Sequence, residues 1–191
     1  MSAFLRRLHP VERSTRVALA LCLLALAAAT APAPAAAQSA VDHVDHTRGV
    51  VSANEAAIVR AEITHTIEKY YEYFSTGQMD RIPQETHHIP WVFLGSGTFT
   101  STAEETATNY RARRQAVVDD LDTDYQKSTY TVTSVCVLSR NAGITSGYNT
   151  RTNSTGGIVS VEGVSYIVMK APQGWRIVAF SEITPEKVIS C

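Results

Sequence analysis

Residues 160–184, SVEGVSYIVMKAPQGWRIVAFSEIT, decide the fold because they predict a β-hairpin. Two runs of β-branched, aromatic and other apolar residues, 166–169 and, apart from Arg176, 175–180, are typical of paired strands. Between them, Pro172 fixes φ and Gly174 permits a positive φ, which is the composition of a tight turn. The stretch therefore indicates two adjacent antiparallel strands near the end of the chain.

The hairpin also predicts which side chains share a face, because successive residues of a strand point to opposite sides. On the first strand, one face is expected to carry Val164, Tyr166 and Val168. The other face of that strand is expected to carry Ile167 and Met169. On the second strand, the residues expected to share a face are Arg176, Val178, Phe180 and Glu182.

Composition excludes one broad class of partner. The 191 residues contain 17 Lys+Arg and 18 Asp+Glu, and the formal net charge is −1. A chain without excess positive charge offers no electrostatic case for nucleic acid, so we expect no nucleic-acid partner. The hydrophobic fraction of 45% suits a chain that folds around an apolar core.

The N-terminal residues 1–37 have the pattern of a secretory signal peptide. Basic residues come first, the apolar run 17–29 follows, and the small residues 35–37 precede Gln38. A retained membrane anchor is the alternative, but the run is shorter than the roughly 20 residues that a membrane span needs. We therefore expect a secreted or periplasmic protein that meets the membrane only through this peptide. Residues 38–51 are expected to be a flexible lead-in, and residues 52–191 one domain.

Two cysteines follow the predicted signal peptide, Cys136 and Cys191. In an oxidising compartment they can form a disulfide. The alternative is a buried Cys136 on a strand and a free Cys191. The sequence leaves both open.

The order of elements predicts an α+β domain. The capping box Ser52–Glu55 begins a helix that Gly77 ends, a second capping box, Ser101–Glu104, begins another, and long β-branched strands follow from residue 125. Helices followed by consecutive strands favour a curved antiparallel sheet wrapped around the N-terminal helices. The stripe expected to face the core on the first helix consists of Val59, Ile63, Ile67, Tyr70 and Phe74.

No sequence motif indicates a cofactor-binding or metal-binding site. The chain has no Gly-rich phosphate loop, CxxC, HExxH or GxSxG pattern, so we expect no cofactor. The stretch 42–46, DHVDH, contains metal-ligating residue types but no flanking structure to hold them, and we expect no metal site. The arginines 111, 113 and 114 are expected on a solvated helix face, with an anion site as the alternative. Arg151 is expected to be exposed, with a ligand clamp as the alternative.

The segment 70–80, YYEYFSTGQMD, the strand 91–94 and the hairpin segment 166–180 together resemble the nuclear transport factor 2-like superfamily. That superfamily includes ketosteroid isomerase, scytalone dehydratase and the SnoaL-like polyketide cyclases. The resemblance covers about residues 54–184. It implies a cone-shaped, cystatin-like α+β roll with a pocket between the sheet and the first helices. It does not imply one function, because this fold carries many chemistries.

The resemblance also suggests pocket residues. The helical tyrosine of ketosteroid isomerase, an enzyme that is a standard worked case of pKa tuning, falls on Tyr70. The late-strand acid falls on Tyr166 and a nearby aromatic on Phe180. The catalytic base falls on Phe93 or Leu94, neither of which accepts a proton. This departure argues against isomerase chemistry by that route.

Three functions remain as hypotheses. The first is binding of a small apolar molecule in an aromatic pocket, with contacts from Phe74, Trp91, Phe93, Phe180 and Glu182. The second is a SnoaL-like hydro-lyase or isomerase, in which His88 is the base and Tyr70 and Tyr166 polarise a carbonyl group. The third is a homodimeric interaction module that pairs through the outer face of the sheet, where Ile167 and Met169 are expected.

Overall fold

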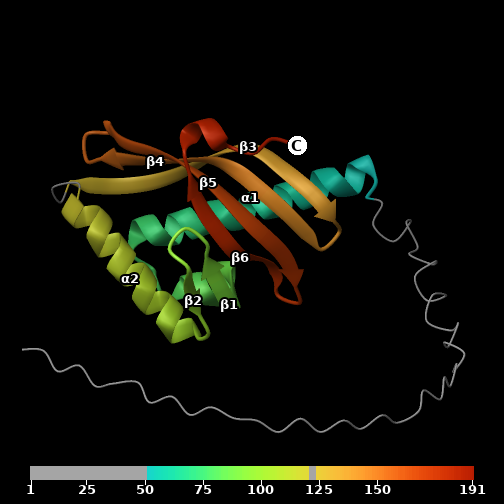
Figure 1. The fold of residues 1–191 in the computed structure, drawn as a ribbon, viewed down its shortest axis with the longest axis horizontal. Coiled ribbons are helices and arrows are strands. Elements are labelled where there is room, and N and C mark those ends of the chain that lie inside the picture. Colours follow the sequence, from blue (N-terminus) through green and yellow to red (C-terminus); the bar gives the residue numbers. More distant parts are fainter. Residues whose placement is uncertain (1–50, 121–123) are drawn as a thin grey trace, which may run out of the picture. The chain divides into compact units, whose positions relative to one another are not determined.

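The computed structural model describes residues 51–120 and 124–191, which form helices packed against one six-stranded sheet (Figure 1). The predicted signal peptide and the predicted metal-ligand stretch 42–46 lie outside the described residues, as does the predicted lead-in except Val51. The elements are α1 (Ala53–Thr76), η1 (Ile82–Thr86), β1 (His87–Phe93), β2 (Thr98–Thr100), α2 (Ala103–Asp120), β3 (Tyr125–Ser139), β4 (Ala142–Asn153), β5 (Ile158–Ala171), β6 (Gly174–Ile183) and η2 (Pro185–Lys187).

Helix α1 begins and ends as its sequence predicts. The Ser52 side chain accepts a hydrogen bond from the Glu55 backbone N–H, and the Glu55 carboxylate accepts one from the Ser52 backbone N–H. Gly77 ends the helix at φ 78°, in the left-handed region that glycine adopts without a steric cost. The predicted apolar stripe is buried throughout, so α1 lies with this face against the concave side of the sheet.

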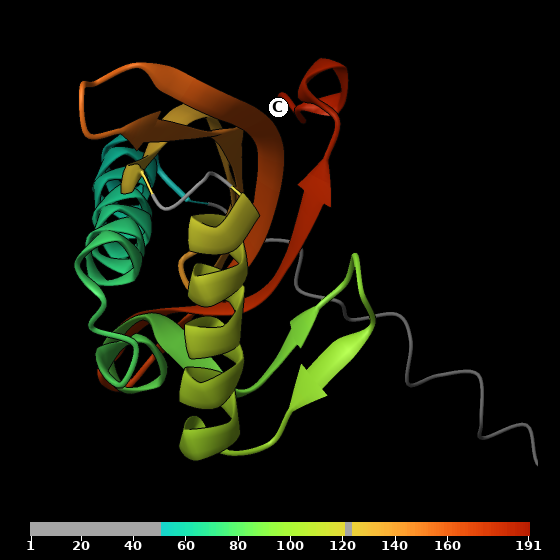
Figure 2. The ribbon, with the colours of Figure 1, turned by 90° about the vertical axis from the view of Figure 1, so that its left-hand side faces the viewer.

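Helix α2 begins one residue later than its capping box predicts. The Thr102 hydroxyl accepts a hydrogen bond from the Glu105 N–H, and the Glu105 carboxylate accepts bonds from the Ser101 and Thr102 backbone N–H groups. Thr102 and Glu105 therefore form the cap in place of Ser101 and Glu104. The fully buried residues of α2 lie in its first half, up to Tyr110, and its second half lies along the open side of the sheet (Figure 2).

The sheet has the strand order β2-β1-β6-β5-β4-β3. Four of the neighbouring pairs are antiparallel, as predicted, but β1 pairs with β6 in parallel. The sheet is therefore mixed, which the sequence pattern did not indicate, because β1 and β6 are far apart along the chain. The strands curve around α1 and α2, and this confirms the predicted α+β fold (Figure 2).

The hairpin of β5 and β6 is confirmed, with one change on its second strand. Val164, Tyr166 and Val168 are buried, as predicted. A β-bulge lies between the pairs Ile167↔Ala179 and Val168↔Ile177. A bulge adds one residue to one strand and reverses the alternation beyond it. Phe180 and Glu182 therefore face the concave side, but the prediction that Arg176 and Val178 share their face is wrong.

The C-terminal segment crosses the outer face of the sheet. Cys136 in β3 forms a disulfide with Cys191, and their Cα atoms are 5.6 Å apart. The Ile189 N–H donates to the Ser146 hydroxyl at 3.0 Å, and the Ser134 hydroxyl donates to the Ile189 carbonyl at 2.6 Å. Of the two alternatives that the sequence left open, the structure thus shows the paired cysteines.

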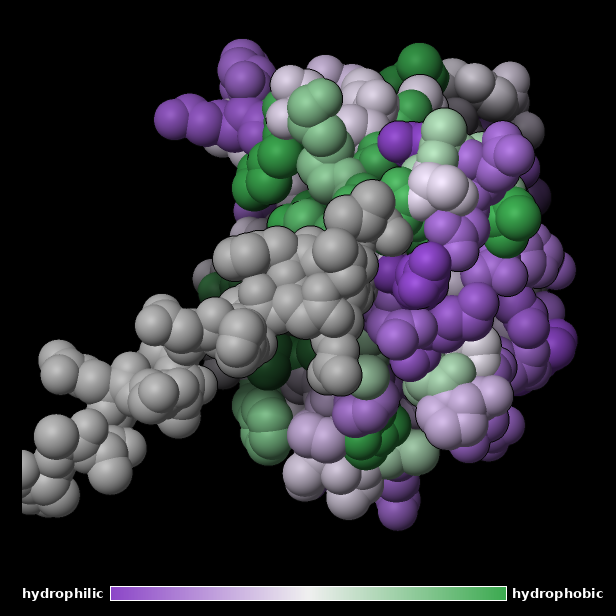
Figure 3. Space-filling view, turned by 90° about the vertical axis from the view of Figure 1, so that its right-hand side faces the viewer, coloured by the Kyte–Doolittle hydropathy of each residue, from purple (hydrophilic) through white to green (hydrophobic). Residues whose placement is uncertain are grey.

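The described surface carries both polar and large apolar side chains. Ile158, Val161 and Ile167 of β5 are among the exposed large apolar residues. Figure 3 shows one side of the molecule, on which hydrophilic side chains cover a continuous area and apolar side chains form smaller patches. In the part of the chain that the structure describes, no helix combines the length and the apolar character that crossing a membrane requires.

Candidate functional site

A cavity of about 460 Å³ lies between the two helices and the concave face of the sheet. Its walls come from α1, from the second half of α2 and from strands β3 to β6. The lining residues are Tyr70, Tyr71, Phe74, Arg113, Ala116, Val117, Asp120, Ser128, Asn149, Arg151, Glu162, Val164, Tyr166, Phe180 and Glu182. The cavity therefore combines aromatic rings with charged and amide side chains.

The apolar floor of the cavity is a group of packed aromatic rings. The Phe180 ring lies 5.6 Å from the Tyr166 ring, centroid to centroid, and Tyr70 lies 6.0 Å from Tyr166. Behind Phe180, Phe93 stacks at 4.5 Å and Trp91 at 5.4 Å. Such contacts stabilise the rings beyond their burial alone. Burial raises the pKa of Tyr70 to about 12, which keeps its hydroxyl protonated.

Two tyrosine hydroxyls meet at the cavity wall. The Tyr71 and Tyr166 oxygens are 2.7 Å apart, and one donates a hydrogen bond to the other. Burial raises the pKa of both tyrosines well above the ordinary value, so both stay protonated. The hydroxyl that accepts keeps its own proton, which makes the pair a hydrogen-bond donor. It is not a base near neutral pH.

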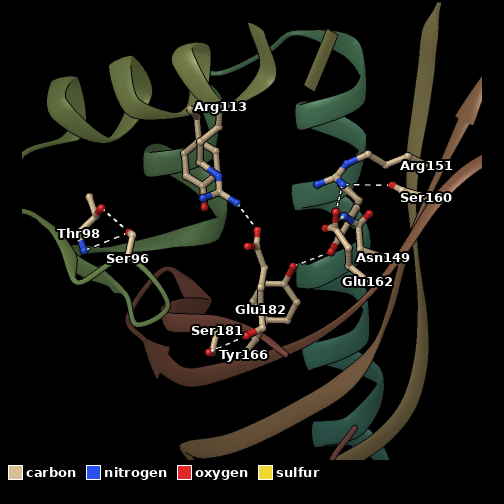
Figure 4. A network of polar contacts seen from close by, with 12 residues as sticks. Ser96, Thr98, Arg113, Asn149, Arg151, Ser160, Glu162, Tyr166, Ser181 and Glu182 are labelled. Atoms are coloured by element: carbon tan, nitrogen blue, oxygen red, sulfur yellow. Dashed lines mark hydrogen bonds and ion pairs between the residues drawn. The ribbon is translucent and has the colours of Figure 1, made fainter. Parts of the chain in front are cut away.

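One end of the cavity carries a polar group that we name the cavity cluster: Asn149, Arg151 and Glu162 (Figure 4). The Arg151 guanidinium forms an ion pair with Glu162 and donates to the Ser160 hydroxyl at 3.2 Å. The Asn149 Nδ2 donates to the other Glu162 oxygen at 3.3 Å. Two buried atoms of the cluster, Asn149 Oδ1 and Arg151 Nε, have no hydrogen-bond partner among the described residues.

A second ion pair crosses the opening between α2 and β6. The Arg113 Nη2 lies 2.6 Å from Glu182 Oε1. The same guanidinium lies over the Phe93 ring at 4.4 Å and over the Phe180 ring at 5.3 Å. Figure 4 shows Arg113 extending from the helix toward Glu182 on the strand. This pair connects the aromatic floor to the helix that covers it.

Most of the predicted site residues come together in this cavity. Tyr70, Phe74, Tyr166, Phe180 and Glu182 line it. Trp91 and Phe93 do not line it, but they support Phe180 from behind.

His88 is not among the lining residues. Its Nδ1 donates to the Pro90 carbonyl at 3.2 Å, on the surface. The neighbouring His87 points inward instead, because side chains alternate along β1.

Apart from Glu182, the polar residues of the lining were not predicted to lie in the cavity. The Arg113 side chain is only 30% exposed and that of Arg151 only 12%, so the expectation that they are solvated or exposed is wrong. Asn149 and Tyr71 were not singled out. The available signal was the spacing of Asn149 and Arg151, two residues apart on one strand. This spacing indicates a polar cluster only once the β4–β5 register is known, because that register places Glu162 opposite Asn149.

His87 is a buried histidine with a strongly shifted pKa, but it lies outside the cavity. Its Nε2 is 2.7 Å from the Tyr110 hydroxyl, and its Nδ1 is 3.0 Å from the Thr86 hydroxyl. Burial lowers its pKa to about 3, so the ring is neutral near pH 7. Both ring nitrogens are occupied, which fits a structural histidine.

The comparisons with known proteins agree on the fold. The model of the family described as NTF2-like protein (DUF6841) matches residues 61–185, and the chain belongs to this family. No curated protein matches the chain.

Solved structures with a similar fold share little sequence with it. Aln2 from a Streptomyces species matches at TM-score 0.54 and 14% identity, covering 72% of this chain and 95% of Aln2. A protein of unknown function with a cystatin-like fold from Nostoc punctiforme matches at TM-score 0.52 and 14% identity, covering 66% and 90%. The Kfla4162 protein from Kribbella flavida matches at TM-score 0.50 and 14% identity, covering 71% and 95%. At these identities the likeness shows the fold alone.

Proposed function

We propose that this protein binds a small, largely apolar ring compound in the cavity between α1, α2 and the sheet. The observation that carries the proposal is a cavity of about 460 Å³ that borders packed aromatic rings. Ligand pockets of roughly 300–1,000 Å³ typically combine an apolar lining with a few placed polar groups. Tyr70, Tyr166 and Phe180 supply an apolar aromatic surface, and the tyrosine hydroxyl pair supplies a donor.

We also propose that the protein is exported. The Cys136–Cys191 disulfide supports this, because disulfides persist mainly in oxidising compartments. The predicted signal peptide 1–37 points the same way. Mass spectrometry of the protein from the periplasm or the medium tests both the disulfide and the removal of the signal peptide. A chain that starts near residue 38 and has no free thiol is expected, whereas a full-length cytosolic chain with three free thiols contradicts the proposal.

The enzymatic alternative has less support than ligand binding. A hydro-lyase or isomerase that uses His88 as its base requires that residue in the cavity, and His88 does not line it. Glu182 is the carboxylate beside the aromatic floor, and it is held by Arg113. The proposed homodimer stays a prediction. Ile167 on the outer face is 43% exposed, and the C-terminal segment crosses this face through Ser134 and Ser146.

The binding proposal is tested with a neutral apolar fluorophore, N-phenylnaphthylamine, and a variant that blocks the cavity. Ala116 lies on α2 at the cavity and is exposed, so Ala116→Phe adds a ring there without disturbing the buried core. Ala112, one turn earlier on the same helix, is exposed and does not line the cavity. Ala112→Phe is therefore the matched control.

We expect the wild-type protein to bind the fluorophore and Ala116→Phe to weaken binding about tenfold or more, a change worth about 1.4 kcal/mol. Ala112→Phe is expected to bind like the wild type. If the fluorophore does not bind, or if both variants bind it equally well, the proposed site is wrong.

A further inference from the structure

Residues 184–191, which follow β6, form a segment that we name the strap. The strap begins by passing over Gly163 of β5, where a Cβ atom would lie only 2.8 Å from the Thr184 carbonyl oxygen. Glycine therefore permits this close approach of the backbone. The strap then crosses the outer face of the sheet, opposite the cavity, and reaches β3, where Cys191 forms the disulfide with Cys136.

The strap crosses a row of serines that we name the serine row. Ser134, Ser146, Ser165 and Ser181 are register partners on the neighbouring strands β3 to β6, so they share one face of the sheet. The Ser146 hydroxyl lies 2.8 Å from the Ser165 hydroxyl and accepts the Ile189 N–H, and Ser146 is fully buried. The strap therefore covers part of this row.

Non-covalent contacts hold the strap only weakly. Among the described residues, two hydrogen bonds join it to the sheet, and both involve the backbone of Ile189. Every strap residue except Val188 is exposed, and the apolar core contains no strap residue. Ordering one residue costs about as much free energy as one hydrogen bond contributes, or more. Two hydrogen bonds therefore do not offset the ordering of the whole strap.

The disulfide supplies the missing constraint, and it lies at the surface. Cys191 is exposed and Cys136 is half-buried, so an external thiolate can approach the bond from the strap side. Exposed disulfides are typically the labile ones, whereas buried structural disulfides resist reduction.

We propose that the Cys136–Cys191 disulfide is a thiol-sensitive switch that holds the strap over the serine row. Its reduction releases the strap and uncovers these hydroxyls, while the domain stays folded. Because the strap lies on the face opposite the cavity, its release does not depend on ligand binding.

The opening step is a thiol–disulfide exchange with a dithiol reductant. One thiolate of the reductant attacks the Cys191 sulfur, and Cys136 leaves as a thiolate and takes up a proton. The second thiol of the reductant then attacks its own sulfur in the mixed disulfide and releases Cys191 as a thiol. The protein gains two electrons and two protons, and the dithiol becomes a disulfide.

Hydrogen exchange measured by mass spectrometry tests the release on the full chain. Cys22, the third cysteine, is replaced by serine, so that only Cys136 and Cys191 react. The oxidised protein is compared with the same protein in dithiothreitol. We expect the backbone amides of residues 186–191 to exchange about tenfold faster or more after reduction, while the β5–β6 hairpin keeps its protection. Unchanged exchange in the strap, or loss of protection throughout the domain, would overturn the proposal.

A variant in the same background separates the disulfide from other effects of the reductant. Cys191→Ser leaves β3 intact and cannot form the bond, so its strap should exchange like that of the reduced protein and should not respond to dithiothreitol. Ser190→Ala, at the exposed neighbouring position, keeps both cysteines and is the matched control. It should behave like the oxidised parent until dithiothreitol is added. If the strap of Cys191→Ser stays as protected as that of Ser190→Ala, the disulfide does not hold it and the proposal is wrong.

Discussion

Two buried polar clusters flank the aromatic core, and they differ in how completely their hydrogen bonds are satisfied. The closed cluster consists of Thr86, His87 and Tyr110. Each of its residues is fully buried, and both His87 nitrogens have partners. In the cavity cluster, Asn149 Oδ1 and Arg151 Nε have none among the described residues. The histidine with a strongly lowered pKa thus belongs to the satisfied cluster. A shifted pKa caused by burial alone therefore does not indicate a site here.

The largest expected effect breaks the closed cluster. His87→Ala removes a buried ring and leaves the Tyr110 hydroxyl without its partner. We expect a loss of about 4 kcal/mol in the free energy of unfolding. Tyr110→Phe, which removes only the hydroxyl, is expected to cost about 1–2 kcal/mol. Urea unfolding measures both. A loss below about 1 kcal/mol for His87→Ala would show that the closed cluster contributes little to the free energy of unfolding.

The next effect appears as a pH dependence of stability. Burial lowers the folded-state pKa of His87 from 6.5 to about 3. Between these values the unfolded chain binds more protons, so stability is retained above pH 6.5 and falls as the pH is lowered. The His87 contribution has a slope of up to about 1.4 kcal/mol per pH unit. Urea midpoints measured between about pH 6 and pH 5 test it, above the range in which carboxylates dominate.

The matched control for this dependence is His87→Gln, which does not titrate. It is expected to be less stable than the wild type at neutral pH but to show a shallower loss toward acid. Equal slopes in the two proteins would mean that the ring of His87 is already protonated, or is reached by water, in the folded state.

A smaller effect is expected from the cavity cluster. Arg151→Met leaves the Glu162 carboxylate half-buried without its ion pair. We expect a loss of about 1–2 kcal/mol, less than for a fully buried pair because Glu162 is partly exposed. Adding Glu162→Gln should restore part of that loss, which a double-mutant cycle in urea measures. If the second substitution adds its own full cost, the two side chains are not coupled.

The smallest effect is expected at the opening of the cavity. The Arg113–Glu182 pair is partly exposed on both sides, and such pairs contribute about 0–1 kcal/mol. Glu182→Gln should therefore change the unfolding midpoint little, and any change should shrink at high salt. Arg151→Met should keep its larger effect at the same salt. A salt-independent loss above about 1 kcal/mol for Glu182→Gln would contradict this order.

Local patterns predicted much of the fold and about half of the site. The stripe on α1, its caps and the hairpin of β5 and β6 follow from periodicity and turn chemistry, which depend on residues close in sequence. The bulge near Val178 and the parallel pairing of β1 with β6 do not. Both depend on how strands far apart along the chain meet.

The residues of the candidate site also divide into those that local patterns predicted and those that depend on contacts between distant segments. Tyr70, Phe74, Tyr166, Phe180 and Glu182 lie on faces that local patterns and the family resemblance predicted.

The ion pairs could not be predicted, because Arg113 meets Glu182 only once α2 lies beside β6, and Arg151 meets Glu162 only through the β4–β5 register. His87 and His88 are consecutive residues of β1, and His87 lies in the core whereas His88 lies on the surface. Sequence alone could not decide which of the two faces inward.

The parallel pairing of β1 with β6 has a consequence for folding kinetics. β3 to β6 pair in sequence order through short turns, whereas β1 reaches β6 only after β2, α2 and the whole meander. Contacts between distant segments cost more chain entropy before they form. We expect the meander to fold first and β1 to dock late, with Trp91 and Phe93 arriving behind Phe180. Substitutions at Trp91 should then mainly accelerate unfolding, whereas substitutions at Val164 should mainly slow folding.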